Sequence, residues 1–160
     1  MLEKNQMRFI ADVMVGRLAK YLRMAGYDVV YINDADDDFI LQIAENEDRI
    51  VLTRDTMMLK RREFKNGILK SVFISDDVLI TQLLQVKYGL DLILRPDLTV
   101  CLICNNPLKK VEKKDIKNKV PPYVYKTQDK FKHCSNCGRY YWQGTHYNYI
   151  KNYFSRLNRD

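Results

Sequence analysis

Residues 8–32 read RFIADVMVGRLAKYLRMAGYDVVYI, and this stretch decides the fold class. The apolar run at 8–11 predicts a short strand. Apolar side chains then recur every three or four residues over 16–25, which predicts an amphipathic helix that stops at Gly26. The β-branched and aromatic run at 29–32 predicts a second strand. A strand, a helix and another strand in succession are typical of a parallel sheet flanked by helices.

The same alternation continues with two further strands, at 50–53 and 71–74. Asp36 or Asp37 can cap the helix before the third strand. A last helix follows the fourth strand, and we expect its buried stripe to consist of Ile80, Leu83 and Leu84. The order of elements therefore predicts an α/β fold.

The pattern changes near residue 97. Helical periodicity stops there, two Cys-x-x-Cys pairs follow, and a terminal helix is expected over 147–157. We therefore expect two domains, at 7–97 and 98–160.

Charge separates the same two parts of the chain. Residues 1–97 carry 14 Lys and Arg against 16 Asp and Glu, a net charge of −2, whereas residues 98–160 carry 13 against 4, a net charge of +9. The second part also holds seven of the eleven Tyr and the only Trp. A basic, aromatic-rich segment favours a polyanionic partner such as nucleic acid. A solvated lysine-rich face is the alternative.

Composition excludes several classes. With 46% hydrophobic and 29% charged residues, the chain is globular rather than disordered. No apolar run approaches the roughly 20 residues of a membrane span, and no Gly-x-Gly-x-x-Gly or Walker loop indicates a nucleotide cofactor. The polar start at 1–6 lacks the apolar core of a signal peptide, so we expect a cytoplasmic protein.

All four cysteines fall in two Cys-x-x-Cys pairs, Cys101 with Cys104 and Cys134 with Cys137. Two such turns direct four thiolates at one ion, which is typical of tetrahedral structural Zn²⁺. A redox pair needs a strand-to-helix turn, which neither pair has, and an iron–sulfur cluster is the remaining alternative. We expect the basic segment to need the metal in order to fold.

Aspartates follow the predicted strands. Asp12 comes after the first strand, Asp55 after the third, and Asp76 and Asp77 after the fourth, where either can cap the next helix. The carboxyl ends of parallel strands meet at one edge, where open α/β sheets bind ligands. Carboxylates gathered there repel one another unless a cation such as Mg²⁺ or Mn²⁺ neutralises them. Such a site suits phosphodiester hydrolysis, and a helix cap or turn is the alternative role of each aspartate.

Four stretches resemble, in the right order, the motifs of the Mut-seven C-terminal RNase domain family, a PIN-like group: 9–28, 35–41, 50–55 and 134–146. The last reads CSNCGRYYWQGTH and resembles the family's closing zinc-ribbon motif. The resemblance implies a PIN-like parallel sheet flanked by helices, then a small zinc ribbon and a C-terminal helix. It also implies a metal-dependent ribonuclease.

By this resemblance Asp12, Asp37 and Asp55 match the acidic positions that bind Mg²⁺ or Mn²⁺. Asp37 is chosen among its neighbours because it stands three residues before Ile40, as the family's helix-start acid does. The fourth PIN acid stays open between Asp76 and Asp77.

Further residues are candidates for substrate contacts. Arg17 and Arg54 can bind phosphate, or they can form salt bridges with the aspartates. Thr53 can orient a carboxylate or a metal-bound water, or it can simply favour the strand. His146 and the aromatic residues at 140–142 can contact RNA bases, with core packing or a surface position as the alternative.

The leading hypothesis is a metal-dependent endoribonuclease whose basic zinc ribbon holds single-stranded RNA, with tRNA or rRNA as substrates. The alternative is a catalytically inactive RNA-binding or ribosome-associated module that uses the same ribbon. Convergence of the three acids distinguishes the two.

Overall fold

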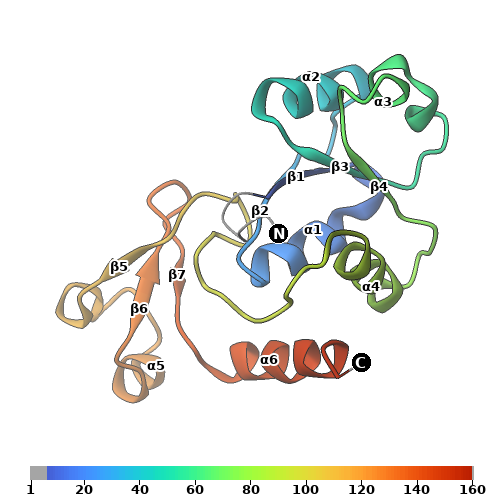
Figure 1. The fold of residues 1–160 in the computed structure, drawn as a ribbon. Helices are drawn as coiled ribbons and strands as arrows, with labels where there is room; N and C mark the ends of the chain where they lie inside the picture. The colour runs from blue at the N-terminus through green and yellow to red at the C-terminus, as the bar shows by residue number, and fades with distance from the viewer. Residues whose placement is uncertain (1–6, 160) are drawn as a thin grey trace.

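The N-terminal strands lie side by side in one parallel sheet of order β2-β1-β3-β4 (Figure 1). The structure is a computed structural model that describes residues 7–159, so the polar start at 1–6 lies outside the described residues. The elements of this part are β1 (Arg8–Ala11), α1 (Gly16–Met24), β2 (Asp28–Tyr31), α2 (Asp37–Glu47), β3 (Ile50–Thr53), α3 (Arg62–Lys65), β4 (Ser71–Phe73) and α4 (Leu79–Leu90).

Side chains of each strand alternate between the two faces of the sheet. Phe9 of β1 packs in the same core as Leu18 of α1 and Leu83 of α4. Ile10, the next residue, packs on the opposite face with Ile40 of α2. Helices therefore cover both faces, as the sequence predicted.

The helix after the fourth strand differs from the prediction. Neither Asp76 nor Asp77 caps α4, since the residue before the helix is Val78 and no side chain caps the helix. The Asp76 carboxylate instead accepts the N–H of Val78 at 2.8 Å, and α4 begins at the next residue, Leu79. Ile80 was expected to be buried, and this expectation is wrong, since Ile80 is 42% exposed and Leu79 takes the buried position.

The C-terminal part contains a small antiparallel sheet of order β5-β6-β7. A short helix, α5, interrupts the long connection between β5 and β6, and Ile116, Val120 and Phe131 form a small core there. The sequence of this connection shows no helical periodicity, so α5 was not expected. The elements are β5 (Lys109–Val111), α5 (Pro122–Thr127), β6 (Phe131–His133), β7 (Tyr140–Tyr141) and α6 (Thr145–Leu157).

The last helix returns to the first part of the molecule. Ile150, Phe154 and Leu157 of α6 belong to the hydrophobic core that α1 and α4 cover. Tyr21 of α1 packs edge-on against Tyr153, with ring centroids 5.5 Å apart. The fold class is thus confirmed, whereas the division of the chain at residue 97 stays a prediction, because α6 shares the core of the N-terminal part.

Candidate active site and metal centre

Asp12 lies at the carboxyl end of β1 with only 4% of its surface exposed. Its Oδ1 accepts the backbone N–H of Met14 at 3.2 Å, which caps a short 3₁₀ turn at Val13–Val15. Its Oδ2 accepts the hydroxyl of Thr53, the last residue of β3, at 2.7 Å. The carboxylate is therefore held both by its own turn and by the adjacent strand.

Thr53 joins the first and third predicted acids. Its fully buried hydroxyl donates to Asp12 and accepts the backbone N–H of Asp55 at 2.9 Å. Asp55 in turn accepts the N–H groups of Met57 and Met58 at 2.8 and 3.3 Å. Because β1 and β3 are adjacent and parallel, Asp12 and Asp55 leave the sheet at the same edge.

Asp37 is the first residue of α2, and its neighbour Asp36 provides the cap by accepting the N–H of Phe39 at 2.9 Å. The sequence left the cap open between these two aspartates. Burial raises the pKa of Asp37 above its ordinary value, and the charges of Asp55 and Asp12 raise it further. The three predicted acids are therefore close enough for the charges of Asp12 and Asp55 to affect the pKa of Asp37.

The three acids lie at the same edge of the sheet but are less closely grouped than the four cysteines. Among residues 7–159, the four cysteines are the only group of three or more metal-binding side chains whose ligand atoms all lie within 4.8 Å of one another. The acids share one edge without reaching that spacing. This donor set fits Mg²⁺ or Mn²⁺, since hard cations take carboxylate oxygens and Mg²⁺ keeps several waters beside one or two carboxylates.

The two predicted arginines influence different groups. Arg54 is close enough to Asp76 for its charge to lower the pKa of that carboxyl, although the Val78 N–H is the main cause. Arg17 is exposed on α1 and faces α6, where it partly opposes the rise that burial causes in the pKa of Tyr153.

A third arginine, Arg61, was missed by sequence reasoning. It forms an ion pair with Asp38 and lowers the pKa of Asp37, against the effects of burial and of the other acids. Its connection with α2 is tertiary, with the two partners 23 positions apart in the sequence, so no local spacing could reveal it.

Exposed apolar side chains stand next to each acid, and sequence reasoning missed these too. Met14, Phe39 and Met57 each follow a predicted acid by two residues, and they are 58%, 45% and 65% exposed. Each occupies a position where hydropathy alone suggests burial. Apolar side chains at such a position can contact nucleic-acid bases.

The four cysteines form a closed cluster. Cys101 and Cys137 lie with their sulfurs 3.5 Å apart, and those of Cys104 and Cys134 are 3.4 Å apart. All four are free thiols, and all four sulfurs lie within 4.8 Å of one another. A tetrahedral Zn²⁺ with Zn–S bonds of about 2.3 Å separates its sulfurs by about 3.8 Å. The cluster thus fits a structural zinc ion.

Both Cys-x-x-Cys turns have the same backbone geometry. In the first, the N–H of Asn105 donates to the carbonyl of Cys101 at 3.0 Å, and in the second, the N–H of Gly138 donates to that of Cys134 at 2.9 Å. Asn105 and Gly138 have φ values of 64° and 77°, which Asn and Gly tolerate best. Local sequence alone therefore builds each half of the site.

The surroundings of Cys104 favour the thiolate that zinc binds. Burial raises the pKa of the thiol, but hydrogen bonds from the Asn106 backbone and from the Asn136 and Asn106 side chains outweigh it and lower the pKa to about 5. A metal-binding cysteine must be deprotonated.

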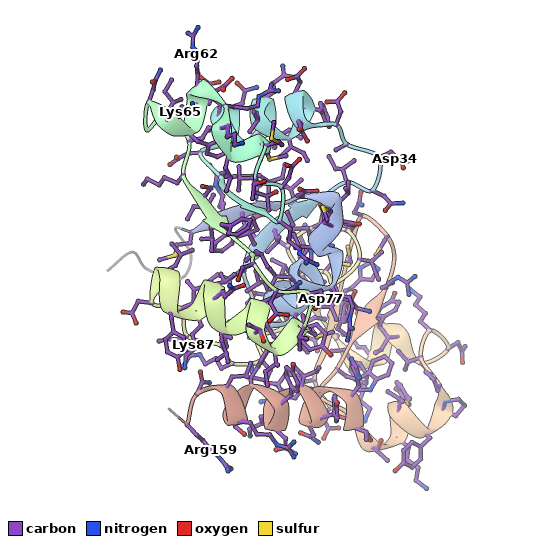
Figure 2. The ribbon with its side chains drawn as sticks, turned by 90° about the vertical axis from the view of Figure 1, so that its right-hand side faces the viewer. Asp34, Arg62, Lys65, Asp77, Lys87 and Arg159 are labelled. Carbon is purple, nitrogen blue, oxygen red and sulfur yellow. The ribbon has the colours of Figure 1, made fainter. Side chains whose placement is uncertain are left out.

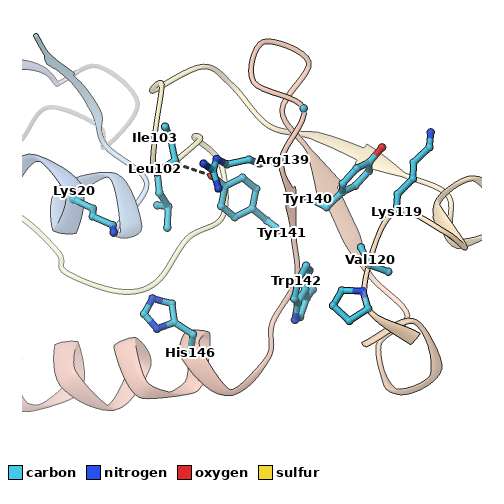
Figure 3. A pocket seen from close by; sticks show the side chains of 12 residues that line it. Lys20, Leu102, Ile103, Lys119, Val120, Arg139, Tyr140, Tyr141, Trp142 and His146 are labelled. Atoms are coloured by element: carbon cyan, nitrogen blue, oxygen red, sulfur yellow. Dashed lines mark hydrogen bonds between the residues drawn. The ribbon is translucent and has the colours of Figure 1, made fainter. Parts of the chain in front are cut away.

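The three aromatic residues after the second turn have different environments. The hydroxyl of Tyr141 contacts the Cys101 sulfur at 3.1 Å. It also accepts the Leu102 N–H at 3.2 Å (Figure 3). Tyr140 stacks on His133 with centroids 4.6 Å apart. Trp142 packs against Phe131, with ring centroids 6.3 Å apart. Tyr141 thus supports the cysteine cluster.

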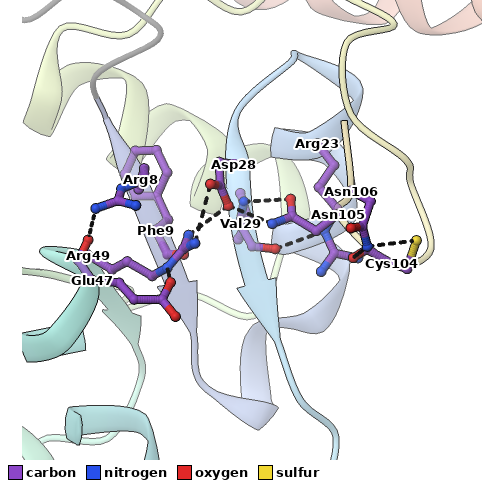
Figure 4. Close-up of polar contacts among 10 residues, drawn as sticks. All are labelled: Arg8, Phe9, Arg23, Asp28, Val29, Glu47, Arg49, Cys104, Asn105 and Asn106. Carbon is purple, nitrogen blue, oxygen red and sulfur yellow. Dashed lines mark hydrogen bonds and ion pairs between the residues drawn. The ribbon is translucent and has the colours of Figure 1, made fainter. Parts of the chain in front are cut away.

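The first cysteine turn is bound to the outer edge of the parallel sheet (Figure 4). The Asn105 side chain accepts the N–H of Val29 in β2 at 2.8 Å and donates to Asp28 at 2.6 Å. Asp28 also pairs with the buried Arg49 at 2.7 Å.

Arg23 completes this junction from α1. It donates to the carbonyl of Val29 at 2.9 Å, and to those of Leu102 and Ile103 at 3.1 Å. Burial lowers the pKa of Arg23, and the charges of Cys101 and Cys104 act in the opposite direction. A Zn²⁺ held by four thiolates would have a net charge of −2, which this guanidinium would partly offset.

No helix within residues 7–159 is long and apolar enough to cross a membrane. The cytoplasmic location stays a prediction.

Comparison with known proteins agrees with the motifs. The family model of the Mut7-C RNAse domain matches residues 7–154. No curated protein and no solved structure shows significant similarity. An RNase domain acts on RNA, so the match indicates a nuclease. With nearly the whole chain matched, and with the α/β fold and the cysteine cluster in place, the chain belongs to the Mut7-C RNAse domain family.

Proposed function

We propose that the protein is a metal-dependent endoribonuclease that hydrolyses RNA phosphodiester bonds at the edge formed by Asp12, Asp37 and Asp55. One observation carries this proposal. The buried Thr53 hydroxyl, at 2.7 Å from Asp12 and 2.9 Å from the Asp55 N–H, ties two of the acids to adjacent strand ends.

Asp12, Asp37 and Asp55 would hold Mg²⁺ or Mn²⁺. Such ions orient a phosphodiester, lower the pKa of an attacking water and stabilise the leaving oxygen. Water adds to phosphorus and the bond to the 3′ oxygen breaks, so the products carry a 5′-phosphate and a 3′-hydroxyl.

The residues of the chain prepare this edge. Thr53 fixes the orientation of Asp12, and Asp36 takes the capping role that Asp37 would otherwise have. Arg17 and Arg54 would contact substrate phosphates, because a guanidinium can bind two phosphate oxygens at once.

The zinc ribbon would hold the RNA. Cys101, Cys104, Cys134 and Cys137 would bind structural Zn²⁺, and the net charge of +9 on residues 98–160 supplies the attraction for phosphate. Single-stranded RNA, including exposed segments of tRNA or rRNA, is the proposed substrate.

A second candidate is a catalytically inactive RNA-binding or ribosome-associated module. It is favoured by the spacing of the acids, which do not form a closed group within 4.8 Å in the part of the chain described. The basic ribbon serves this function equally well.

The deciding experiment compares cleavage of several single-stranded RNAs by the wild type and by Asp55→Asn, with Mg²⁺ or Mn²⁺. We expect cleavage only by the wild type, with RNA binding retained in both. Asp34→Asn, which removes an exposed acid after β2, is the matched control and should remain active. Equal activity of the wild type and Asp55→Asn would show a contaminant or another site. A wild type that is inactive on all RNAs with both ions would favour the binding module.

A further inference from the structure

A cleft lies between the zinc ribbon, α1 and the start of α6 (Figure 3). It has two adjoining lobes of ≈ 440 and ≈ 460 Å³, each within the size range of small-molecule sites. The lobes share a wall formed by Leu102, Tyr140, Tyr141, Trp142 and His146. No Asp or Glu lines either lobe, so the cleft is distinct from the acidic edge.

The two lobes differ in character. The first is bordered by three exposed cations, Lys20 of α1 with Lys119 and Arg139 of the ribbon. The second is mostly apolar, and its floor includes Leu98 and the buried Ile150. A nucleotide matches both lobes, since its anionic phosphate suits the lobe bordered by cations and its flat, largely apolar base suits the apolar lobe.

Trp142 stands in the wall common to both lobes. Among the described residues, its indole N–H has no protein hydrogen-bond partner, and since no buried side-chain nitrogen or oxygen there is unpaired, this donor is accessible to a ligand or to water. A Cβ at position 144 would come within 2.8 Å of this nitrogen, so Gly144 is what leaves room for the ring. The wall thus offers both an aromatic surface and a donor.

The mouth of the cleft is close to the proposed catalytic edge along the chain. Lys20 follows Asp12 by eight residues, mostly through the 3₁₀ turn and α1. At roughly 1.5–2.0 Å per residue, these positions are about 12–16 Å apart. One RNA strand can therefore reach both places.

We propose that this cleft binds one unpaired nucleotide of the RNA, with its base in the second, mostly apolar lobe and its phosphate in the first lobe, at Lys20 and Arg139. The ligand class rests on the proposed function. The two parts of the chain would then hold the strand together, the ribbon through the base and through Arg139, and α1 through Lys20.

The single tryptophan makes the test direct, because all tryptophan fluorescence comes from Trp142. The zinc-loaded full chain carrying Asp55→Asn is titrated, without Mg²⁺ or Mn²⁺, with eight-nucleotide oligouridylate and oligoadenylate, with UMP and AMP, and with ribose 5-phosphate. We expect a saturable fluorescence change with the oligonucleotides and nucleotides. Ribose 5-phosphate, which has no base, should give none.

Two pairs of variants localise the binding. Gly144→Ala should crowd Trp142 and weaken oligonucleotide binding about five- to a hundredfold, the range measured for loss of one base stack. Gly89→Ala, where an added Cβ meets only Val72 at 4.0 Å, is its control. Zinc content and thermal melting establish that each variant is folded.

Lys20→Gln should lower the slope of log affinity against log salt by about one. Its control is Lys65→Gln, which removes the same charge from α3, at the end of the molecule away from the ribbon (Figure 2). The control should leave both the base-dependent fluorescence change and the affinity nearly unchanged.

The outcomes separate this inference from the nuclease proposal. RNA that binds by anisotropy without changing Trp142 fluorescence, and with equal affinity for Gly144→Ala, would overturn the cleft while leaving the nuclease untouched. A chain that binds none of these ligands would overturn it as well. A fluorescence response in a chain without cleavage activity would retain the cleft and reject the nuclease.

Discussion

The cysteine cluster and the acidic edge gather their ligand atoms in different ways. The four sulfurs lie within 4.8 Å of one another, whereas the three carboxylates share an edge without reaching that spacing. The cysteines are held by two short turns whose backbone bonds close within five residues. The acids come from three separate elements, and only Asp12 is buried and doubly bound. Local geometry therefore builds the first site, and sheet topology builds the second.

The cysteine cluster and the acidic edge also differ in how the protein shifts the pKa of their side chains. Hydrogen bonds lower the pKa of Cys104 to about 5, so the zinc site favours a deprotonated ligand. At the acidic edge, burial and neighbouring charges raise the pKa of Asp37. Within the cysteine cluster the effect is uneven, since the pKa of Cys137 is raised to about 11, whereas the pKa of Cys104 is lowered.

The largest expected effect comes from breaking the closed cluster. Cys134→Ser removes a fully buried ligand, and zinc sites of this kind contribute about 10–16 kcal/mol of binding free energy to folding. We expect loss of zinc and unfolding of residues 98–145 before the parallel sheet. Metal analysis and segment-resolved hydrogen exchange measure this, with Ser135→Ala as the control. A variant that keeps its zinc, or whose ribbon stays protected, would contradict the prediction.

Truncation after Asp97 is a poor way to separate the two parts. It removes α6, and with it Ile150, Phe154 and Leu157, which the core of the N-terminal part needs.

The junction between the two parts can be tested at Asn105. Asn105→Ala removes two hydrogen bonds to β2 and places alanine at a φ of 64°, which should cost about 2–4 kcal/mol. Asn105→Gly removes the same bonds without the backbone strain and should cost about 1 kcal/mol less. Chemical denaturation of the zinc-loaded proteins measures both. Equal losses in the two variants would rule out a contribution from the left-handed backbone.

At the acidic edge, Thr53→Val keeps the shape of the side chain and removes its hydroxyl. We expect a loss of about 1–3 kcal/mol in stability, because the Asp55 N–H and the Asp12 carboxylate lose a buried partner. Cleavage should fall more than RNA binding, and Thr53→Ser should restore it. If Thr53→Val cleaves as fast as the wild type, the hydroxyl does not orient the acid.

The smallest expected effect concerns repulsion among the acids. Since the folded-state pKa of Asp37 is raised, its contribution to stability is present below about pH 4 and is lost as pH rises through the raised value. Without divalent ions, Asp37→Asn should therefore raise the Tm by about 1–3 °C at pH 7 and leave it unchanged at pH 3.5. Asp34→Asn is the control. Mg²⁺ should stabilise the wild type more than the variant at pH 7, and an equal response to Mg²⁺ would argue against an ion at Asp37.

Sequence patterns could predict the parallel sheet because its strands and helices have distinct periodicities, as residues 8–32 illustrate. The zinc ligands could be predicted because Cys-x-x-Cys spacing is itself the geometry. The hydroxyl of Thr53 on Asp12 and the ion pair of Arg61 with Asp38 join residues 41 and 23 positions apart, and no local pattern encodes them. The exposure of Ile80 was mispredicted because the buried stripe of α4 runs through Leu79, Leu83 and Val86, and the side of α4 that meets the core is set by tertiary packing.

The Asn105 turn also covers part of an outer strand of the parallel sheet. β2 is an outer strand of the parallel sheet, and an outer strand with free N–H and C=O groups is a template for pairing with another chain. Here both backbone groups of Val29 are hydrogen-bonded, since its N–H donates to the Asn105 side chain and its carbonyl accepts from Arg23. The opposite outer strand, β4, has only three residues. If the cysteines hold zinc, stripping it should loosen the turn and free Val29, so we expect chelation to promote pairing of β2 with another chain.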